Sequence, residues 1–408
     1  MRRTPVAVVA VWASLAAGLA AQTPAGAALL PPAETRAALM DEARLTKAGT
    51  LTPEAVSTWE RRMLALEARN FPRNLFAGEY NGVRALIGGM PSGSGFVGGV
   101  GYMQGATGDR LRFNVSARLS TENYRQLDAE ALLPTARSGR PFQVRLHGRY
   151  ADYRALDLFA LGQGSAPEAK GAYRFESRTA SVSVSSRAGR QIAIGAESGL
   201  LNGSVRSFDG GGGRFPELPG AALQPVFVFG GGHVALTLRD RTLRFAGLRL
   251  IADATRWVDV DTDLFDFTRL VGELQAHLPL GARNRMLALR VRTSHSIADS
   301  GARVPFYLME TIGGAKSIRG FDEYRFRDTR NLVANVEYRW EIWNYADLVI
   351  FGDVGRVFSD ADDFSWSGVA AGYGIGLRSV LPGGGGFRID LARGREGFRL
   401  HIGGGPSF

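Results

Sequence analysis

The residues of this chain best placed for chemistry are one arginine in a long polar loop and two acidic residues downstream of it. Arg319 stands in the segment 313–321, and Glu337 and Asp353 stand in the next two strongly alternating segments. The planar guanidinium of an arginine carries a fork of N–H donors that suits paired carboxylates. The chemistry expected of these residues is therefore ion pairing between a loop and two strands.

Residue alternation places both acids on the same side of their strands. One face of 331–342 is apolar and the other is polar, with Asn335, Glu337, Arg339 and Glu341 on the polar side. In the next strand the apolar face is Leu348, Ile350, Gly352 and Val354, so the opposite face carries Phe351, Asp353 and Gly355. Two carboxylates on one side of neighbouring strands repel each other unless a cation lies between them. The long loop that precedes them could supply Arg319 as that cation.

The same period-two pattern extends from about residue 94 to the end of the chain, as in 142–147, 287–292 and 398–402. Alternation alone would also fit a soluble β-sandwich with one solvated face. The connections, however, alternate between short and long. Short ones fall near 134–141, 187–190, 239–242, 280–284, 343–346 and 381–386, and longer ones near 161–171, 203–224, 258–263, 297–330 and 359–365. This asymmetry favours a transmembrane antiparallel β-barrel, with about 14 strands after residue 94.

The N-terminus has the parts of a secretory signal peptide, which we assign to 1–27. Arg2 and Arg3 precede an apolar run from Val6 to Ala20, and small residues follow, so that cleavage could fall after Ala20 or after Ala27. Residues 28–70 are expected to form a short helical or spacer segment. No later apolar run approaches the ~20 residues that a membrane-spanning helix needs.

The segment Arg319-Gly320-Phe321, followed at this distance by the inward Glu337 and Asp353, resembles the bacterial surface antigen family. This family comprises the BamA- and TamA-type outer-membrane barrels. The resemblance implies that 71–408 form a bacterial outer-membrane barrel of about 16 strands, two of them from 71–90, and that the loop 297–330 folds into the lumen. It implies a contact between this loop and the barrel wall made by Arg319, Gly320, Phe321, Glu337, Phe351, Asp353 and Gly355. Here Gly320 would permit a tight bend and Phe321 would pack the loop against the wall.

The last strand is the second candidate site. Phe398, Leu400, Ile402 and Phe408 share one parity, which predicts that the terminal Phe408 continues the lipid-facing stripe and resembles the signal read by the outer-membrane assembly machinery. Between them stand Gly403, Gly404, Gly405 and Pro406, which weaken a strand. They predict either a weak seam between the first and last strands, as in the lateral gate proposed for the family, or a frayed C-terminal end.

Enzyme signatures are missing from the sequence: it has no Gly-x-Ser-x-Gly, phosphate-loop or His-Glu-x-x-His motif. Cysteine is absent, and the five histidines lack metal-ligand spacing. We therefore expect no enzyme, no cofactor and no metal. Gly372-x-Gly374-x-Gly376 stands in a strand with no helix after it, which indicates close packing rather than nucleotide binding.

The net charge of +10 comes from arginines spread through the strands, which argues against a nucleic-acid partner. Contact with anionic headgroups of outer-membrane lipids is the expected use of this charge. The resemblance implies a role in the insertion or translocation of protein, or of lipid, at the outer membrane. Since no periplasmic POTRA array is apparent, a partner protein is expected to supply client capture. The alternative is a passive pore or structural barrel.

Overall fold

The computed structural model describes residue 46 and residues 82–104, 111–133, 142–207, 217–239, 247–281, 284–343, 346–379, 386–404 and 408. The chain divides into two compact units, 1–68 and 69–408, and all described strands belong to the second. The expected signal peptide over 1–27 lies outside the described residues, as does the segment 28–70 apart from residue 46. None of the described helices is long and apolar enough to cross a membrane.

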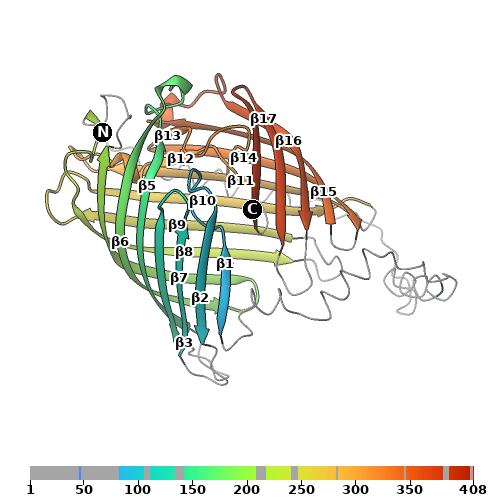
Figure 1. The fold of residues 1–408 in the computed structure, drawn as a ribbon, viewed down its shortest axis with the longest axis horizontal. Coiled ribbons are helices and arrows are strands. Elements are labelled where there is room, and N and C mark those ends of the chain that lie inside the picture. The colour runs from blue at the N-terminus through green and yellow to red at the C-terminus, as the bar shows by residue number, and fades with distance from the viewer. Residues whose placement is uncertain are drawn as a thin grey trace. The chain divides into compact units, whose positions relative to one another are not determined.

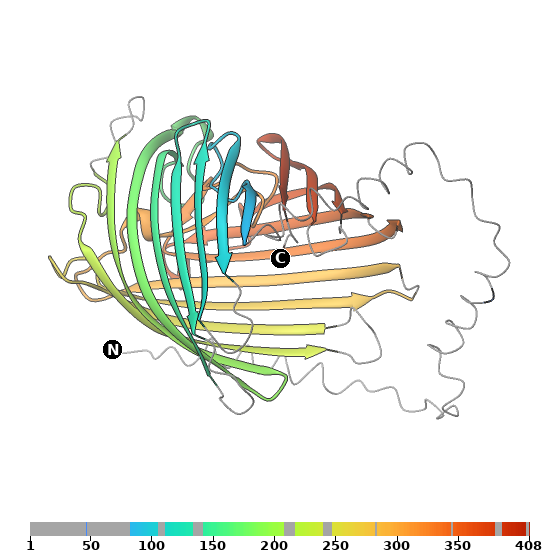
Figure 2. The same cartoon turned by 60° about the horizontal axis from the view of Figure 1, so that its bottom comes forward.

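Sixteen antiparallel strands form one continuous sheet. They are β1 (Val83–Ile87), β2 (Val97–Gln104), β3 (Arg112–Ser120), β4 (Arg125–Leu133), β5 (Phe142–Leu158), β6 (Gly171–Ala188), β7 (Ile192–Ser207), β8 (Val226–Arg239), β9 (Gly247–Asp259), β10 (Phe267–Pro279), β11 (Arg285–Ala298), β14 (Arg330–Trp343), β15 (Ala346–Phe358), β16 (Ala370–Ser379), β17 (Phe387–Gly394) and β18 (Gly397–Gly404). Each pairs with the next in this order, and the sheet curls round on itself as a barrel wall (Figures 1 and 2). The expected barrel is confirmed.

The distribution of the strands differs from the expectation in one respect. Fifteen strands of the sheet follow residue 94, and the described residues before it contain only β1, whereas we expected about 14 and two. The additional strand lies in the N-terminal part of the pattern. There β2 reads Val-Gly-Gly-Val-Gly, and glycines at both parities hide the alternation of polar and apolar side chains on which the count depends.

The two faces of the sheet differ as the alternation predicts. On β14 and β15 every buried residue from Asn331 to Gly355 has an odd number, while Val336, Ile350 and Val354 are exposed on the other face. The same exposed stripe continues on β18, where Leu400 is 62% exposed. Apolar side chains with this exposure face the lipid of a membrane barrel, and the polar parity faces the lumen.

The longest connection between described strands, 299–329, returns inside the barrel. It contains the 3-10 turn η4 (Phe306–Leu308) and a small hairpin of β12 (Glu310–Ile312) and β13 (Phe326–Asp328). The hairpin contacts the inner faces of β11, β14 and β15. We call residues 299–329 the lumen loop. Two further 3-10 turns, η2 (Pro167–Ala169) and η5 (Ala361–Asp363), lie in other connections on the same side.

Buried aromatic residues hold the lumen loop in place. Phe306 is fully buried in a cluster with Tyr124 and Tyr173, and Tyr173 belongs to β6 on another part of the wall. Phe321 and Phe326 are fully buried against β14, β15 and the start of β16. Burying large aromatic side chains is strongly favourable. The loop is therefore a packed part of the barrel interior.

Candidate functional site

Arg319 projects from the lumen loop onto the carboxylates of β14 and β15. Its Nε and Nη2 donate to the two oxygens of Asp353 at 2.8 and 2.7 Å, and its Nη1 donates to Glu337 Oε1 at 2.5 Å. Its backbone N–H also donates to Asp353. All three residues are at most 2% exposed. The structure thus brings together the arginine and the two acids that the sequence singled out.

Two residues on the following strands extend this contact into a network. Arg378 of β16 donates to Asp390 of β17 at 2.5 Å and to Glu337 at 3.2 Å. Arg319 Nη1 also lies 3.8 Å from Asp390. We call Arg319, Glu337, Asp353, Arg378 and Asp390 the Arg319 cluster. It joins the lumen loop to four consecutive strands.

Every ion of the cluster has an oppositely charged partner within it, and Arg339 of β14 adds a further ion pair to Glu337, at 2.7 Å. A buried ion costs several kcal/mol of desolvation unless an opposite charge and hydrogen bonds compensate it. Burial alone would lower the pKa of Arg319, but its hydrogen bonds and charge interactions with Asp353 and Glu337 raise that pKa above the ordinary value. The guanidinium also lies 3.5 Å from the ring centre of Phe351, a cation–π contact. Arg319 is therefore held as a cation between two anions and an aromatic face.

Gly320 lies in a turn, but its close approach to the wall is what requires a glycine. We expected it to permit a tight turn, and the Phe321 N–H does donate to the Ile318 carbonyl oxygen across Arg319 and Gly320, at 3.2 Å. The φ of Gly320 is not positive; the left-handed glycines of this loop are Gly301, Gly313 and Gly314. A Cβ on Gly320 would instead lie 2.7 Å from the backbone N of Gly394 on β17. Gly372 of β16 packs against Gly320 in the same way. The expected turn at Gly320 is thus present, but the reason for the glycine is backbone-to-backbone contact.

The other residues predicted for this contact also make room for the loop or pack against it. Phe321 packs on the wall beside Val333 and Val357. Gly355 leaves space for Ile318 of the loop, whose Cδ1 would lie 2.9 Å from a Cβ there. Gly374, in the glycine-rich strand β16, likewise leaves space for the ring of Phe351. The close packing expected of these glycines is what the structure shows.

The lumen loop also contacts the last hairpin, β17–β18, and these contacts were not anticipated. His401 of β18 lies with its Nε2 2.8 Å from the Arg319 carbonyl oxygen. Because a carbonyl oxygen only accepts, Nε2 of His401 is the donor. Arg399 of β18 donates to Asp322 at 2.5 Å, and Arg325 donates to Glu396 in the β17–β18 turn at 2.8 Å. The alternation of 398–402 placed Arg399 and His401 inward, but nothing in it gave their partners.

The C-terminal residues agree only in part with the sequence interpretation. Gly403 and Gly404 remain in β18, opposite Arg388 and Phe387, while Gly405 and Pro406 lie outside the described residues. Phe408 does not continue the lipid-facing stripe: its ring centre lies 5.6 Å from the guanidinium of Arg339, an inward residue of β14. Strand alternation no longer governs a residue beyond the end of β18, and the aromatic face is instead available to a cation.

The sheet has two strands with one described neighbour each. β1 pairs only with β2 and β18 only with β17, so no hydrogen-bonded ladder joins β1 to β18 among the described residues. An unpaired strand edge exposes N–H and C=O groups that can pair with another strand. In the part of the chain that the structure describes, no group of acidic or histidine residues could hold a metal ion.

A barrel of this kind, with a loop bound inside it by buried ion pairs, is a membrane protein of the outer-membrane class. Residues 258–408 match the Omp85 superfamily domain, a range that includes the lumen loop and the whole Arg319 cluster. A comparison with curated protein sequences finds no match.

Solved structures of bacterial outer-membrane barrels share the fold. The chain is similar to BamA from Haemophilus ducreyi lacking POTRA domains 1–3, with a TM-score of 0.61 and 15% identity over 84% of this chain and 77% of that one. It is similar to CdiB from Escherichia coli, with a TM-score of 0.55 and 14% identity over 78% of this chain and 61% of that one. For CdiB from Acinetobacter baumannii the TM-score is 0.53 and the identity 17%, over 78% of this chain and 58% of that one.

The chain thus spans about three fifths of the two CdiB chains. The family match assigns an Omp85 superfamily domain to residues 258–408, and the likeness to the solved structures shows that the described barrel has their fold. The resemblance inferred from Arg319-Gly320-Phe321 is confirmed.

Replacing Arg319 with alanine should destabilise the folded barrel strongly, because Asp353 would remain buried without its cation, and Glu337 would keep only Arg339 and Arg378. Breaking a buried pair in this way costs about 3–5 kcal/mol. We expect Arg319→Ala to reduce the heat-modifiable folded form or to raise open-pore conductance in planar bilayers. Arg319→Lys should be intermediate, because a lysine keeps the charge but loses the planar fork. The control is Arg303→Ala, an exposed arginine of the same loop. Wild-type behaviour of Arg319→Ala in both assays would contradict this role.

A methyl group at Gly320 should displace the lumen loop from β17. The Cβ of Gly320→Ala would lie 2.7 Å from the Gly394 nitrogen, and overpacking of this kind costs about 1–3 kcal/mol. Urea unfolding should show a lower midpoint for this variant. Gly164→Ala is the matched control, since its Cβ would meet nothing within 4 Å. Equal midpoints for the two variants would show that the loop does not depend on the close contact.

Proposed function

We propose that this barrel assists the insertion or translocation of protein at the outer membrane by movement of its last hairpin relative to β1, with the lumen loop controlling that movement. The role is not enzymatic. The observation that carries the proposal is the double attachment of the loop. Arg319 binds Glu337 and Asp353 on the wall by its side chain, and it binds His401 on β18 by its backbone carbonyl.

This attachment means that the last strand cannot move far without disturbing the loop. β18 has a hydrogen-bonded ladder on one side only among the described residues. Its remaining support comes from the loop, through His401 and Arg399. A strand supported in this way can separate from β1 at lower cost than a strand with two ladders. The loop is therefore the element that would keep the barrel closed or let it open.

A passive pore is the second candidate, and one observation favours it. Between the lumen loop and β11 and β14 a cavity of about 360 Å³ remains, lined by Arg290, Arg292, Glu310 and Lys316 among others. A polar space of this size can hold water or a small solute. In such a barrel the buried ion pairs would fix the loop permanently and no strand would need to move.

A disulfide between β1 and β18 separates the two candidates. The chain has no cysteine, so a pair placed at Ala85 and at Leu400, with 398 and 402 scanned as alternatives, forms without competition. Under oxidising conditions we expect cells that depend on this variant to lose folded outer-membrane or secreted proteins while the variant itself assembles normally. Reduction should restore them.

The matched control places cysteines at Val100 and Ala117, which face each other on the paired strands β2 and β3. This bond joins strands that already share a ladder and should leave function unchanged. Normal function of the oxidised β1–β18 variant would contradict the proposed movement and favour the passive pore.

Removing the contact between His401 and the loop should loosen β18. One neutral hydrogen bond is worth about 0.5–1.5 kcal/mol, which corresponds to a rise of about threefold to tenfold in local opening. We expect faster amide hydrogen exchange in β18 of His401→Ala, with β5 and β6 unchanged. His401→Gln keeps a side-chain N–H donor and should restore part of the protection. Equal exchange of β18 in all three proteins would show that His401 does not hold this strand.

A further inference from the structure

The outer face of β4–β7 carries four exposed or half-exposed arginines near the end of the barrel that bears the long loops. They are Arg125, Arg174, Arg178 and Arg206, and they share their face with the lipid-facing residues of the same strands. Long loops lie on the extracellular side of outer-membrane barrels. This basic patch therefore lies at the level of the outer leaflet or just above it.

The acids of this face neutralise only part of the patch. Asp152 accepts two hydrogen bonds from Arg174, both at 2.8 Å, and Glu176 accepts one from Arg178 at 3.3 Å. Arg125 and Arg206 form no ion pair with any described residue. Four guanidinium groups thus share two carboxylates. The patch keeps a positive charge that attracts anions.

Arg206 is the residue whose surroundings most need an anion. In the register of β6 and β7 it lies directly opposite Arg174. Side chains in such pairs lie about 5 Å apart, and like charges there are destabilising. A phosphate between the two guanidinium groups would turn this repulsion into two charge-assisted hydrogen bonds.

The position of Tyr150 sets the depth of the patch in the membrane. Tyr150 lies opposite Arg178, whose guanidinium is 5.9 Å from the centre of its ring, and its hydroxyl donates to Glu176. Aromatic residues with one polar end mark the boundary between headgroups and hydrocarbon. Two residues further along β6, about 6.6 Å away, Ala180 begins an apolar region. Arg178 thus stands at headgroup level, directly above hydrocarbon, and Arg174 and Arg206 stand four residues, about 13 Å, further out.

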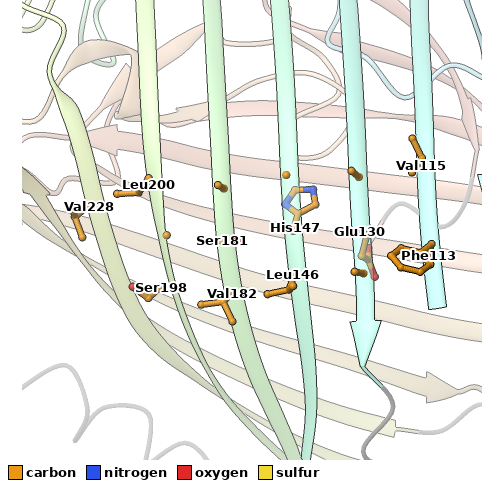
Figure 3. A pocket seen from close by; sticks show the side chains of 15 residues that line it. Phe113, Val115, Glu130, Leu146, His147, Ser181, Val182, Ser198, Leu200 and Val228 are labelled. Atoms are coloured by element: carbon orange, nitrogen blue, oxygen red, sulfur yellow. The ribbon is translucent and has the colours of Figure 1, made fainter. Parts of the chain in front are cut away.

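Below the patch lies an open groove of about 650 Å³ that crosses β3–β8 (Figure 3). Its floor is made by three small residues that face one another across the strands, Ala129, Gly148 and Ala180. A Cβ on Gly148 would meet nothing within 4 Å, so the groove is open there. Phe113 and Val228 stand at its two edges in Figure 3. A groove of this depth and lining suits an acyl chain.

We propose that this face binds a phosphorylated, acylated glycolipid of the outer leaflet. Its phosphates would lie on the patch, between Arg174 and Arg206 and against Arg178, and one acyl chain would occupy the groove over Gly148. The patch and the groove are separate observations, and a single lipid molecule of this class satisfies both. The site lies on the outer surface, so it does not depend on movement at the seam.

The test uses the full-length barrel in detergent and titrates it with purified lipopolysaccharide, with bound molecules counted by native mass spectrometry. We expect saturable binding that weakens as salt is raised. The double variant Arg178→Ala/Arg206→Ala should bind about tenfold more weakly, because it loses charged hydrogen bonds to phosphate. The matched control is Arg285→Ala/Arg303→Ala, which removes two exposed arginines elsewhere. Wild-type affinity of the patch variant would overturn the proposal.

Three further measurements identify the parts of the ligand. Lipopolysaccharide stripped of phosphate should bind wild type as weakly as the intact lipid binds the patch variant. Gly148→Leu fills the groove without changing charge and should weaken binding of the intact lipid several-fold, while binding of deacylated lipopolysaccharide stays unchanged. Equal affinity for phosphatidylglycerol would overturn the assignment to a glycolipid, since that lipid carries one phosphate and no sugar. Heat-modifiability of each variant verifies that the barrel is folded.

Discussion

The salt bridge from Arg319 to Glu337 and Asp353 is the constraint on which the lumen of this barrel depends. Two carboxylates on the inner faces of neighbouring strands would repel each other and would be costly to bury alone. The wall supplies Arg339 and Arg378 to Glu337, but Asp353 has Arg319 of the loop as its only ion-pair partner among the described residues, so the charge of Asp353 is compensated only when that loop is inside. This explains why residues 299–329 fold inward, although they connect β11 and β14 at the rim of the barrel.

Electrostatics alone would not position the loop so closely. The guanidinium reaches both acids because the loop backbone at Gly320 lies against the backbones of Gly372 and Gly394, with no side chain between them. Gly355 and Gly374 remove further side chains, where Ile318 and Phe351 pack. Glycine weakens a strand, yet here Gly355 of β15 and Gly372 of β16 face the loop. Their cost to the sheet is offset by the short, well-aligned hydrogen bonds that close packing allows.

The period-two alternation of polar and apolar residues made much of the barrel and of the Arg319 site predictable. It gave the barrel, the inward parity of Glu337 and Asp353, and the return of a long loop that could bring Arg319 to them. It could not give Arg378, Asp390 or His401 as partners, because the register between distant strands is not encoded in the period of any one strand. Period-two alternation over 387–391 places Arg388 and Asp390 on one side of their strand, but it does not show that Asp390 pairs with Arg378. The prediction that Phe408 continues the lipid-facing stripe failed for a related reason, since the alternation of strand faces does not extend beyond the last paired residue.

The contacts of the lumen loop fall into two groups, and their difference in strength matters. Toward β14 and β15 the loop makes two buried ion pairs through Arg319, of which the one to Asp353 is bidentate. Toward β18 it makes one hydrogen bond to His401 and a partly exposed ion pair from Arg399 to Asp322, interactions of a kind that contribute less. If the barrel yields anywhere under load, it should therefore yield between the loop and β18, while the loop stays bound to the wall. The turn of the last hairpin stays joined to the loop by the buried ion pair between Arg325 and Glu396, so the loop acts as a fixed support against which β18 can move.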